Sequence, residues 1–225
     1  MDATYFRKKK NTEPWCAVVF RDPIKKENLW FGFSEVENNN LYLQGRTYLE
    51  SLGYVFLGAT GDGFSCIRKV FNDIPFQMCL VHMERIVVRK ITRRPKLEAG
   101  QVLLALIKTL GHCPSDIWKD RFKKYIEKYR DFLNEKTLHP ESGISSWTHK
   151  ELRSAVLSAQ MFLSYLFTHE AMKNISQTTN SLEGHFSHVK DILRIHRGMS
   201  NHLLKKVLSA IFLASTIAPK SKGVV

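Results

Sequence analysis

The chain has 225 residues, 44% of them hydrophobic and 24% charged, which is long enough for one large domain or two small ones. Its formal net charge of +13 at pH 7 favours a polyanionic partner, although a basic solvated surface would carry the same charge. No segment reaches the roughly 18 to 20 apolar residues that cross a bilayer, and the N-terminus lacks an apolar secretory core. The four cysteines show no disulfide framework. Composition therefore predicts a soluble, cytoplasmic protein with no membrane partner.

Apolar runs in the first quarter of the chain predict a β-meander followed by a helix. Strands are expected at residues 1–6, 13–20 and 29–36, because these runs are rich in aromatic and β-branched residues and are separated by turn-forming residues. A run of asparagines then predicts the cap of a helix at residues 41–52, which a glycine ends.

The stretch at residues 54–82 reads as strand, helix and strand. A buried strand is expected from Tyr54 to Leu57, a helix capped by Ser65, and a second strand from Phe76 to Val81. Two strands joined by one helix are most simply parallel, with a right-handed crossover. Open parallel sheets bind ligands outside the carboxyl ends of their strands, and Asp62 falls at such an end, between two glycines.

From about residue 84 onward, the apolar pattern is helical. Aromatic residues at spacings of four and three in one of these segments indicate a packed core rather than a cofactor site. Helices with apolar faces are expected at residues 97–110, 117–133, 150–168, from Asn180 onward, and at 203–215.

Three carboxylates that are far apart in the sequence are candidates for phosphodiester chemistry with two metal ions. Asp2 lies on the first strand, Asp62 follows a strand, and Glu183 lies on a late helix. Hard Mg²⁺ ions prefer oxygen ligands, and two ions roughly 3.5 to 4 Å apart activate the attacking oxygen and stabilise the leaving oxygen. Each residue also has a simpler interpretation: a frayed terminus for Asp2, a turn for Asp62, and a capping box with Asn180 for Glu183.

The order of the motifs resembles that of the Mutator-like DDE transposases, which include enzymes of mutator-type insertion sequences. The motifs are D-A-T-Y-F, then T-G-D-G with a C-x2-H pair, then T-T-N-S-L-E, and they extend over essentially the whole chain. The resemblance implies an α/β, RNase H-like fold with a mixed five-stranded sheet that is interrupted by an all-α insertion. Residues 1–93 and 173–225 would form the core, and residues 94–172 the insertion.

The same resemblance implies the catalytic domain of a DDE transposase, which cleaves and transfers DNA strands during DNA transposition and recombination with Mg²⁺ or Mn²⁺ as cofactor. Asp2, Asp62 and Glu183 match the catalytic, metal-binding carboxylates, and Cys79 and His82 match the C-x2-H signature. The implied partners are transposon ends and target DNA, with a homo-oligomer assembled on the DNA. The implied location is the cytoplasm of a bacterium, in association with the nucleoid.

Several further residues are candidates for supporting this site. Cys79 and His82 are expected to pack and hydrogen-bond beside the carboxylates, with half of a zinc site as the alternative. Asn180 is expected to cap the helix that carries Glu183. His185 is a candidate for touching the substrate or the metal, as is His188, and the simpler interpretation of both is a surface histidine.

Four residues are expected to contact DNA. Lys190, Arg194 and Arg197 recur on one stripe of a helix together with Glu183, where cations would hold phosphates. Trp147 lies in the helical insertion, where related hAT-like enzymes present an aromatic residue to a flipped base, and core packing is the alternative.

Two other functions stay open at this point. Members of the family that this chain resembles carry further strand residues before the first aspartate, and a DNA-binding segment upstream of that strand. One alternative is therefore that this chain is a truncated, non-catalytic DNA-binding remnant of such an enzyme. It predicts DNA binding without cleavage. A stand-alone RNase H-like nuclease is another, and it predicts cleavage without sequence preference and without strand transfer.

Overall fold

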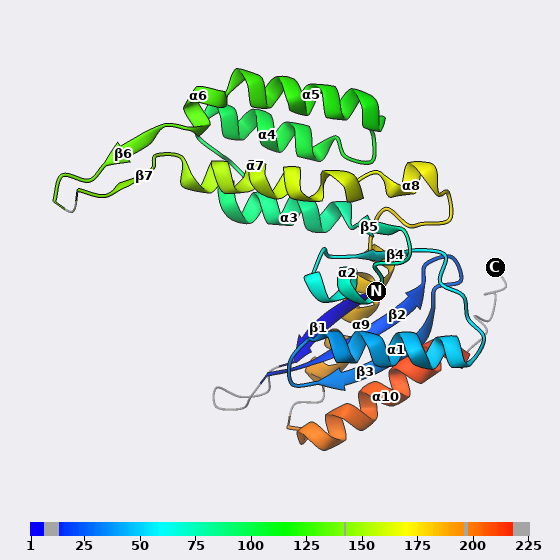
Figure 1. Cartoon of the computed structure of the whole chain (residues 1–225). Coiled ribbons are helices and arrows are strands. Elements are labelled where there is room, and N and C mark those ends of the chain that lie inside the picture. The colour runs from blue at the N-terminus through cyan, green and yellow to red at the C-terminus, as the bar shows by residue number, and fades with distance from the viewer. Residues whose placement is uncertain (7–13, 142, 196–197, 218–225) are drawn as a thin grey trace, which may run out of the picture. The chain divides into compact units, whose positions relative to one another are not determined.

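The computed structural model describes residues 1–6, 14–141, 143–195 and 198–217 (Figure 1). The chain divides into two compact units. The first unit comprises Met1–Phe76 and Thr179–Val225, and the second comprises Gln77–Thr178. Within the described ranges, no helix combines the length and the apolar character that a membrane crossing requires.

The first unit is built on a three-stranded antiparallel sheet, as the predicted meander requires. Its strands are β1 (Asp2–Phe6), β2 (Trp15–Asp22) and β3 (Glu27–Ser34), and they lie in the order β1-β2-β3. The central strand is buried along WCAVVF, because both faces of the sheet are covered by helices. The register pairs Asp2 with Val19, and Val19 with Phe31.

Helix α1 (Asn39–Ser51) packs on β2 and β3. Asn38 caps it by accepting a hydrogen bond from the backbone N–H of Leu41 at 3.0 Å, so the predicted asparagine cap is confirmed. The contact with β3 depends on two glycines. A Cβ atom at Gly32 would lie 2.5 Å from the ring of Trp30, and one at Gly45 would lie 2.6 Å from the same ring.

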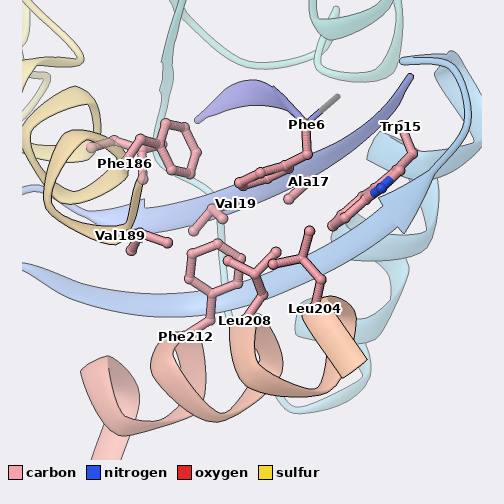
Figure 2. Packing of buried hydrophobic residues seen from close by; sticks show 10 residues of the cluster. Phe6, Trp15, Ala17, Val19, Phe186, Val189, Leu204, Leu208 and Phe212 are labelled. Carbon is pink, nitrogen blue, oxygen red and sulfur yellow. The ribbon is translucent and has the colours of Figure 1, made fainter. Parts of the chain in front are cut away.

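Helices α9 (Asn180–Ile195) and α10 (Asn201–Ile217) complete the first unit. They share a hydrophobic cluster with β1 and β2, and Figure 2 shows Phe212 of α10 beneath Val19 of the sheet. Phe212 contacts Phe31 with ring centroids 5.3 Å apart. The buried members of the cluster are Phe6, Trp15, Ala17, Val19, Leu182, Phe186, Val189, Leu204, Leu208 and Phe212.

The second unit is mainly a helical array. Its elements are α3 (Leu80–Ile91), α4 (Glu98–Lys108), α5 (Ser115–Lys128), α6 (Arg130–Leu133), β6 (Lys136–Leu138), β7 (Ser145–Trp147), α7 (Lys150–Phe162), a 3₁₀ turn (Leu163–Tyr165) and α8 (Thr168–Ala171). Helix α3 packs against both α4 and α7, so the unit begins at Gln77, whereas the sequence placed the start of the insertion at residue 94. The predicted aromatic core is confirmed, because Trp118 and Phe122 are buried and Trp118 donates its indole N–H to the Leu106 carbonyl at 3.0 Å.

The prediction of an RNase H-like, mixed five-stranded sheet interrupted by an all-α insertion is wrong. More than half of the described residues are helical, and the described strands form only sheets of two or three strands. Besides the meander, β4 (Ala59–Gly61) pairs with β5 (Phe76–Met78), and β6 pairs with β7 as an antiparallel hairpin. The hairpin lies inside the second unit, so that unit is not all-α either.

The expected strand from Tyr54 to Leu57 does not form, for a local reason. Gly53 has a φ of +85°, and the backbone N–H of Tyr54 donates to the Leu49 carbonyl at 3.0 Å, so this segment finishes α1. Val55 is then 80% exposed, without the burial that a core strand needs. The second expected strand is short because the Cys79 carbonyl already accepts the first helical bond of α3.

Candidate active site

Asp2 lies on the face of the sheet that α9 and α10 cover. Its partner Val19 belongs to the cluster beneath those helices, and residues paired across a sheet point to the same face. Asp2 is only 7% exposed, and its Oδ1 atom accepts a hydrogen bond from the backbone N–H of Ala3 at 2.8 Å. The structure therefore describes an ordered, buried carboxylate, and the interpretation of Asp2 as a frayed terminus is wrong.

Asp62 directly follows β4, next to the start of β1. The backbone nitrogen of Met1 donates to the Thr60 carbonyl at 2.8 Å, which ties the start of β1 to β4. Asp2 directly follows Met1 in the sequence, and Asp62 lies two residues after Thr60. The Asp62 Oδ1 atom accepts the backbone N–H of Phe64 at 2.9 Å. Asp62 is thus held in a turn, and that turn lies beside the strand that carries Asp2.

The glycines around Asp62 have separate physical roles. Gly63 adopts a φ of +83°, which few residues other than glycine reach without strain. A Cβ atom at Gly61 would lie 2.8 Å from Ile67, which is fully buried. The T-G-D-G sequence therefore lets the turn close tightly against the buried Ile67 of α2 (Ser65–Val70).

Glu183 lies in the first turn of α9, but the helix starts one residue earlier than predicted. The Thr179 carbonyl accepts the backbone N–H of Glu183 at 3.0 Å, which makes Thr179 the cap residue and Asn180 the first helical residue. In a capping box, the glutamate stands three residues after the cap. Glu183 stands four residues after it, so the backbone register disfavours the capping-box interpretation.

Two polar contacts fix how α9 faces the sheet. Arg21 of β2 donates from Nε to the Ser181 hydroxyl at 3.1 Å, and the Asn28 amide nitrogen of β3 lies 3.1 Å from Nε2 of His185. Ser181 and His185 are four residues apart and share one flank of the helix. This flank of α9 therefore faces the strands β2 and β3.

Glu183 lies on the opposite flank of α9. Successive helical residues are rotated by about 100°, so Glu183 and Ser181 lie on either side of the buried Leu182 and Phe186. In the strand order, β1 is on the side of β2 away from β3, and α9 contacts β1. The helix therefore presents Glu183 toward the side of the sheet that carries Asp2.

Glu37 is a fourth carboxylate in this region, and the sequence analysis missed it. It accepts a hydrogen bond from the Tyr42 hydroxyl at 2.6 Å. Burial raises the pKa of Glu37, the Tyr42 bond opposes that change, and the charges of Asp62 and Asp2 raise the pKa further. These charge interactions are consistent with Asp62 and Asp2 in one neighbourhood. The available sequence signal was a glutamate just after a strand and just before a helix cap.

A buried polar network lies beneath α9 and α10. Asn28 is fully buried, and its side-chain oxygen accepts a hydrogen bond from Arg21 Nη1 at 2.6 Å. Its amide nitrogen donates to the Phe212 carbonyl at 3.2 Å and also faces His185. Burial, together with the charges of Arg21 and His188, lowers the pKa of His185 to about 4. His185 is therefore neutral at pH 7 and takes part in packing, which differs from both sequence interpretations of that residue.

The expected DNA contacts on α9 occupy its outer surface. Lys190 is exposed, with Nζ 5.9 Å from the centre of the Phe6 ring, and Arg194 is exposed, with Nη1 3.3 Å from Asp191 Oδ1. Glu183, Lys190 and Arg194 lie on one stripe of the helix, as their spacing requires. Arg197 lies outside the described residues.

In the second unit, Trp147 is partly buried on the β6-β7 hairpin. Arg153 lies over its ring at 4.1 Å from the centroid, and Lys136 lies at 4.7 Å. The ring therefore packs against cations rather than in an apolar core.

Cys79 and His82 stand at the start of α3, with Cys79 fully buried and its sulfur within 4.8 Å of a ring nitrogen of His82. A separation within this limit allows the two atoms to bind one metal ion.

The donors in the first unit suit a hard divalent cation. Asp2, Asp62 and Glu183 offer carboxylate oxygens, which Mg²⁺ and Mn²⁺ prefer. Among the described residues, Oδ1 is the only Asp62 oxygen with a hydrogen bond, so its second oxygen is available to a ligand. The three carboxylates therefore fit this cation by the type of their donor atoms, although among the described residues their oxygens do not form a group within 4.8 Å of one another.

Comparisons with known proteins add no relative to this picture. No family model matches the chain, and no curated protein matches it.

Proposed function

We propose that this chain is the catalytic domain of a DDE transposase of the Mutator-like type, which cleaves and transfers DNA strands with divalent metal ions. The observation that carries the proposal is the hydrogen bond from Met1 to Thr60, because it sets the strand of Asp2 beside the turn of Asp62. The orientation of α9 supports Glu183 as the third carboxylate. The correction of the sheet topology leaves these three residues within one compact unit.

Asp2, Asp62 and Glu183 would hold Mg²⁺ or Mn²⁺. When bound, such ions activate the attacking oxygen and stabilise the leaving oxygen of a phosphodiester. The burial of Asp2 and the turn around Asp62 keep two of the ligands preorganised, which reduces the reorganisation needed at the moment of reaction. The charges of Asp62 and Asp2 raise the pKa of Glu37, and a divalent cation bound by those carboxylates would offset this repulsion.

The cations on the outside of α9 would contact the DNA backbone. Lys190 and Arg194 share the helix stripe of Glu183, so a duplex held along that stripe would pass the carboxylate. The net charge of +13 supports a polyanionic partner through counterion release. The partners in this proposal are transposon ends and target DNA, bound by a homo-oligomer in association with a bacterial nucleoid.

The test is cleavage of a labelled duplex that carries the ends of the element, taken from the DNA that flanks the gene. The wild type is compared with Asp62→Asn and Glu183→Gln, with and without Mg²⁺ or Mn²⁺. Loss of an outer-shell partner already costs about 10- to 100-fold, so each ligand change should reduce cleavage by more than about 100-fold. The control is Glu35→Gln, an exposed carboxylate two residues from Glu37, which should cut like the wild type.

Each outcome separates the alternatives. Metal-dependent cleavage that needs Asp62 and Glu183, followed by joining of the new 3′ end to target DNA, supports the transposase. Cleavage without strand transfer favours a nuclease. A folded wild-type protein that binds the duplex and never cuts it contradicts the catalytic proposal and favours a DNA-binding remnant.

A further inference from the structure

The end of α3 and the turn that follows it carry a dense group of cations. Residues 85–96 contain six arginines and lysines and no carboxylate. Five of these residues are exposed, and four of the five, Arg89, Arg93, Arg94 and Lys96, lie within residues 89–96. We call residues 89–96 the basic turn. No other function proposed for this chain uses them.

The cations of the basic turn differ from those of α5 in the same unit. On α5, Lys123 lies 4.0 Å from Glu127, Lys124 lies 2.7 Å from Asp120, and Lys128 lies 2.9 Å from Glu98. Within the part of the chain that the structure describes, none of the ion pairs involves the four exposed cations of the basic turn. Their charge is therefore not offset by a neighbouring carboxylate.

The backbone of the basic turn is held by specific contacts. Thr92 has a φ of +67°, which is uncommon for a β-branched residue, and its N–H donates to the Val88 carbonyl at 2.8 Å. The Thr92 hydroxyl accepts the N–H of Arg94 at 3.3 Å. Strained residues of this kind persist only where the surrounding structure fixes them.

The second half of the turn is anchored to α4. Gln101 donates from Nε2 to the Pro95 carbonyl at 3.1 Å. A Cβ atom at Gly100 would lie 3.0 Å from Cβ of Pro95, so the proline packs closely on the helix at that point. The turn thus presents its cations from a fixed backbone, and less conformational entropy is lost when they bind.

We propose that the basic turn is a DNA-backbone contact surface in the second unit, separate from the cations of α9. This inference rests on the proposed function, in which DNA is the substrate. Arginine side chains bind phosphates in a bidentate manner, and unpaired cations release counterions from DNA when they bind it. Contacts of this kind position a duplex without reading its sequence. The basic turn would therefore hold DNA of any sequence.

The experiment compares the salt dependence of DNA affinity for two triple variants of the full chain. The test variant is Arg93→Gln/Arg94→Gln/Lys96→Gln, and the control is Lys123→Gln/Lys124→Gln/Lys128→Gln, which removes the same number of charges from paired sites. Fluorescence anisotropy with a labelled random-sequence duplex, without divalent ions, gives the slope of log Kobs against log salt concentration.

The test variant should reduce the steepness of that slope by about 0.9 for each phosphate that the protein no longer neutralises, and it should weaken binding at 0.1 M salt by about tenfold or more. The control should change the slope by less than about 0.9. Arg93→Lys/Arg94→Lys should keep the wild-type slope, because it retains the charges. Circular dichroism melting verifies that each variant folds.

A test variant with the wild-type slope, or with a slope no different from that of the control, overturns the inference. Tight binding of the wild type to anionic phosphatidylserine vesicles, abolished in the test variant while DNA binding persists, overturns it as well. The inference and the proposed function fail separately. If the wild type binds DNA through the basic turn and never cuts it, only the catalytic proposal is contradicted. If the wild type cuts DNA and the test variant keeps the wild-type salt dependence of DNA affinity, only the proposal of a DNA contact at the basic turn is contradicted.

Discussion

The two units of this chain stabilise their interiors in different ways. Among the described residues, the buried polar side chains of the first unit are Asp2, Thr4, Asn28 and Thr179, whereas that of the second unit is Gln77. The second unit packs aromatic and aliphatic side chains and leaves its charges outside. Buried polar groups are costly unless they are satisfied, so a unit that retains several is using them to orient other groups. The first unit therefore combines a hydrophobic core with several buried polar side chains, whereas among its described residues the second unit buries one, Gln77.

Truncation of a central aromatic residue should have the largest effect, and it tests whether the units are independent. Phe212→Ala in the first unit and Trp118→Ala in the second remove fully buried side chains, and each should lower the free energy of unfolding by about 3–5 kcal/mol. Native-state hydrogen exchange along the chain should show reduced protection within the unit that carries the change. An equal decrease of protection in both units would mean that the chain unfolds as one cooperative body.

Loss of Asn28 should have the next largest effect. Asn28→Ala leaves Arg21, His185 and the Phe212 carbonyl without this partner, so the free energy of unfolding should fall by about 2–3 kcal/mol. The matched control is Asn134→Ala in the second unit, an exposed residue that accepts from Arg153. Urea denaturation measures both. Similar decreases for the two variants would remove the contrast between the units.

Acid should destabilise the first unit through His185. The pKa of His185 is lowered from 6.5 to about 4 by burial, with Arg21 and His188 adding to the effect, so the unfolded chain binds more protons between these values. Stability is therefore complete above pH 6.5 and falls as the pH decreases toward 4, by about 2 kcal/mol once the partial exposure of the ring is considered. Urea denaturation at about pH 7 and about pH 4.5 measures this change. His185→Gln should lack this part of the pH dependence, and an unchanged dependence in that variant would refute the assignment.

The smallest effect is expected at the hairpin of the second unit. Lys136→Gln removes one cation from the Trp147 ring, and an exposed cation–π contact is worth about 0.5–1 kcal/mol. Thermal denaturation followed by tryptophan fluorescence measures the change, and Lys150→Gln, which replaces another exposed lysine, is the control. A decrease in the free energy of unfolding of more than about 2 kcal/mol would show that Lys136 contributes more to the hairpin than one exposed cation–π contact.

Local signals in the sequence predicted most elements but not their assembly. The cap at Asn38 was correct because it depends on one side chain and one N–H. The segment at Tyr54–Leu57 was wrong because its apolar composition satisfies a strand pattern, whereas its first N–H is used to end α1. Leu97 and Met161 are apolar residues within the helices expected at residues 97–110 and 150–168, and both are exposed, because a helix start and a small rotation along a helix decide which face a residue occupies.

The candidate site was predictable in part. Asp2, Asp62 and Glu183 could be chosen from the sequence because the order of their motifs resembles that of a known family, whereas the position of each carboxylate alone also suits a structural role. Glu37 was not chosen, because its electrostatic interactions with Asp2 and Asp62 join residues that are far apart in the sequence. The network of Asn28 with His185 likewise joins residues 157 positions apart, which no local pattern reveals.

The tight fit of Trp30 against Gly32 and Gly45 has a consequence for the evolution of this chain. Because the ring occupies the space that side chains at positions 32 and 45 would need, these three positions are not free to vary separately. A homologue with a larger residue at either glycine position should carry a smaller one at position 30. Correlated substitution at these positions would therefore mark the register between β3 and α1 in more distant relatives, even where the surrounding sequence has diverged.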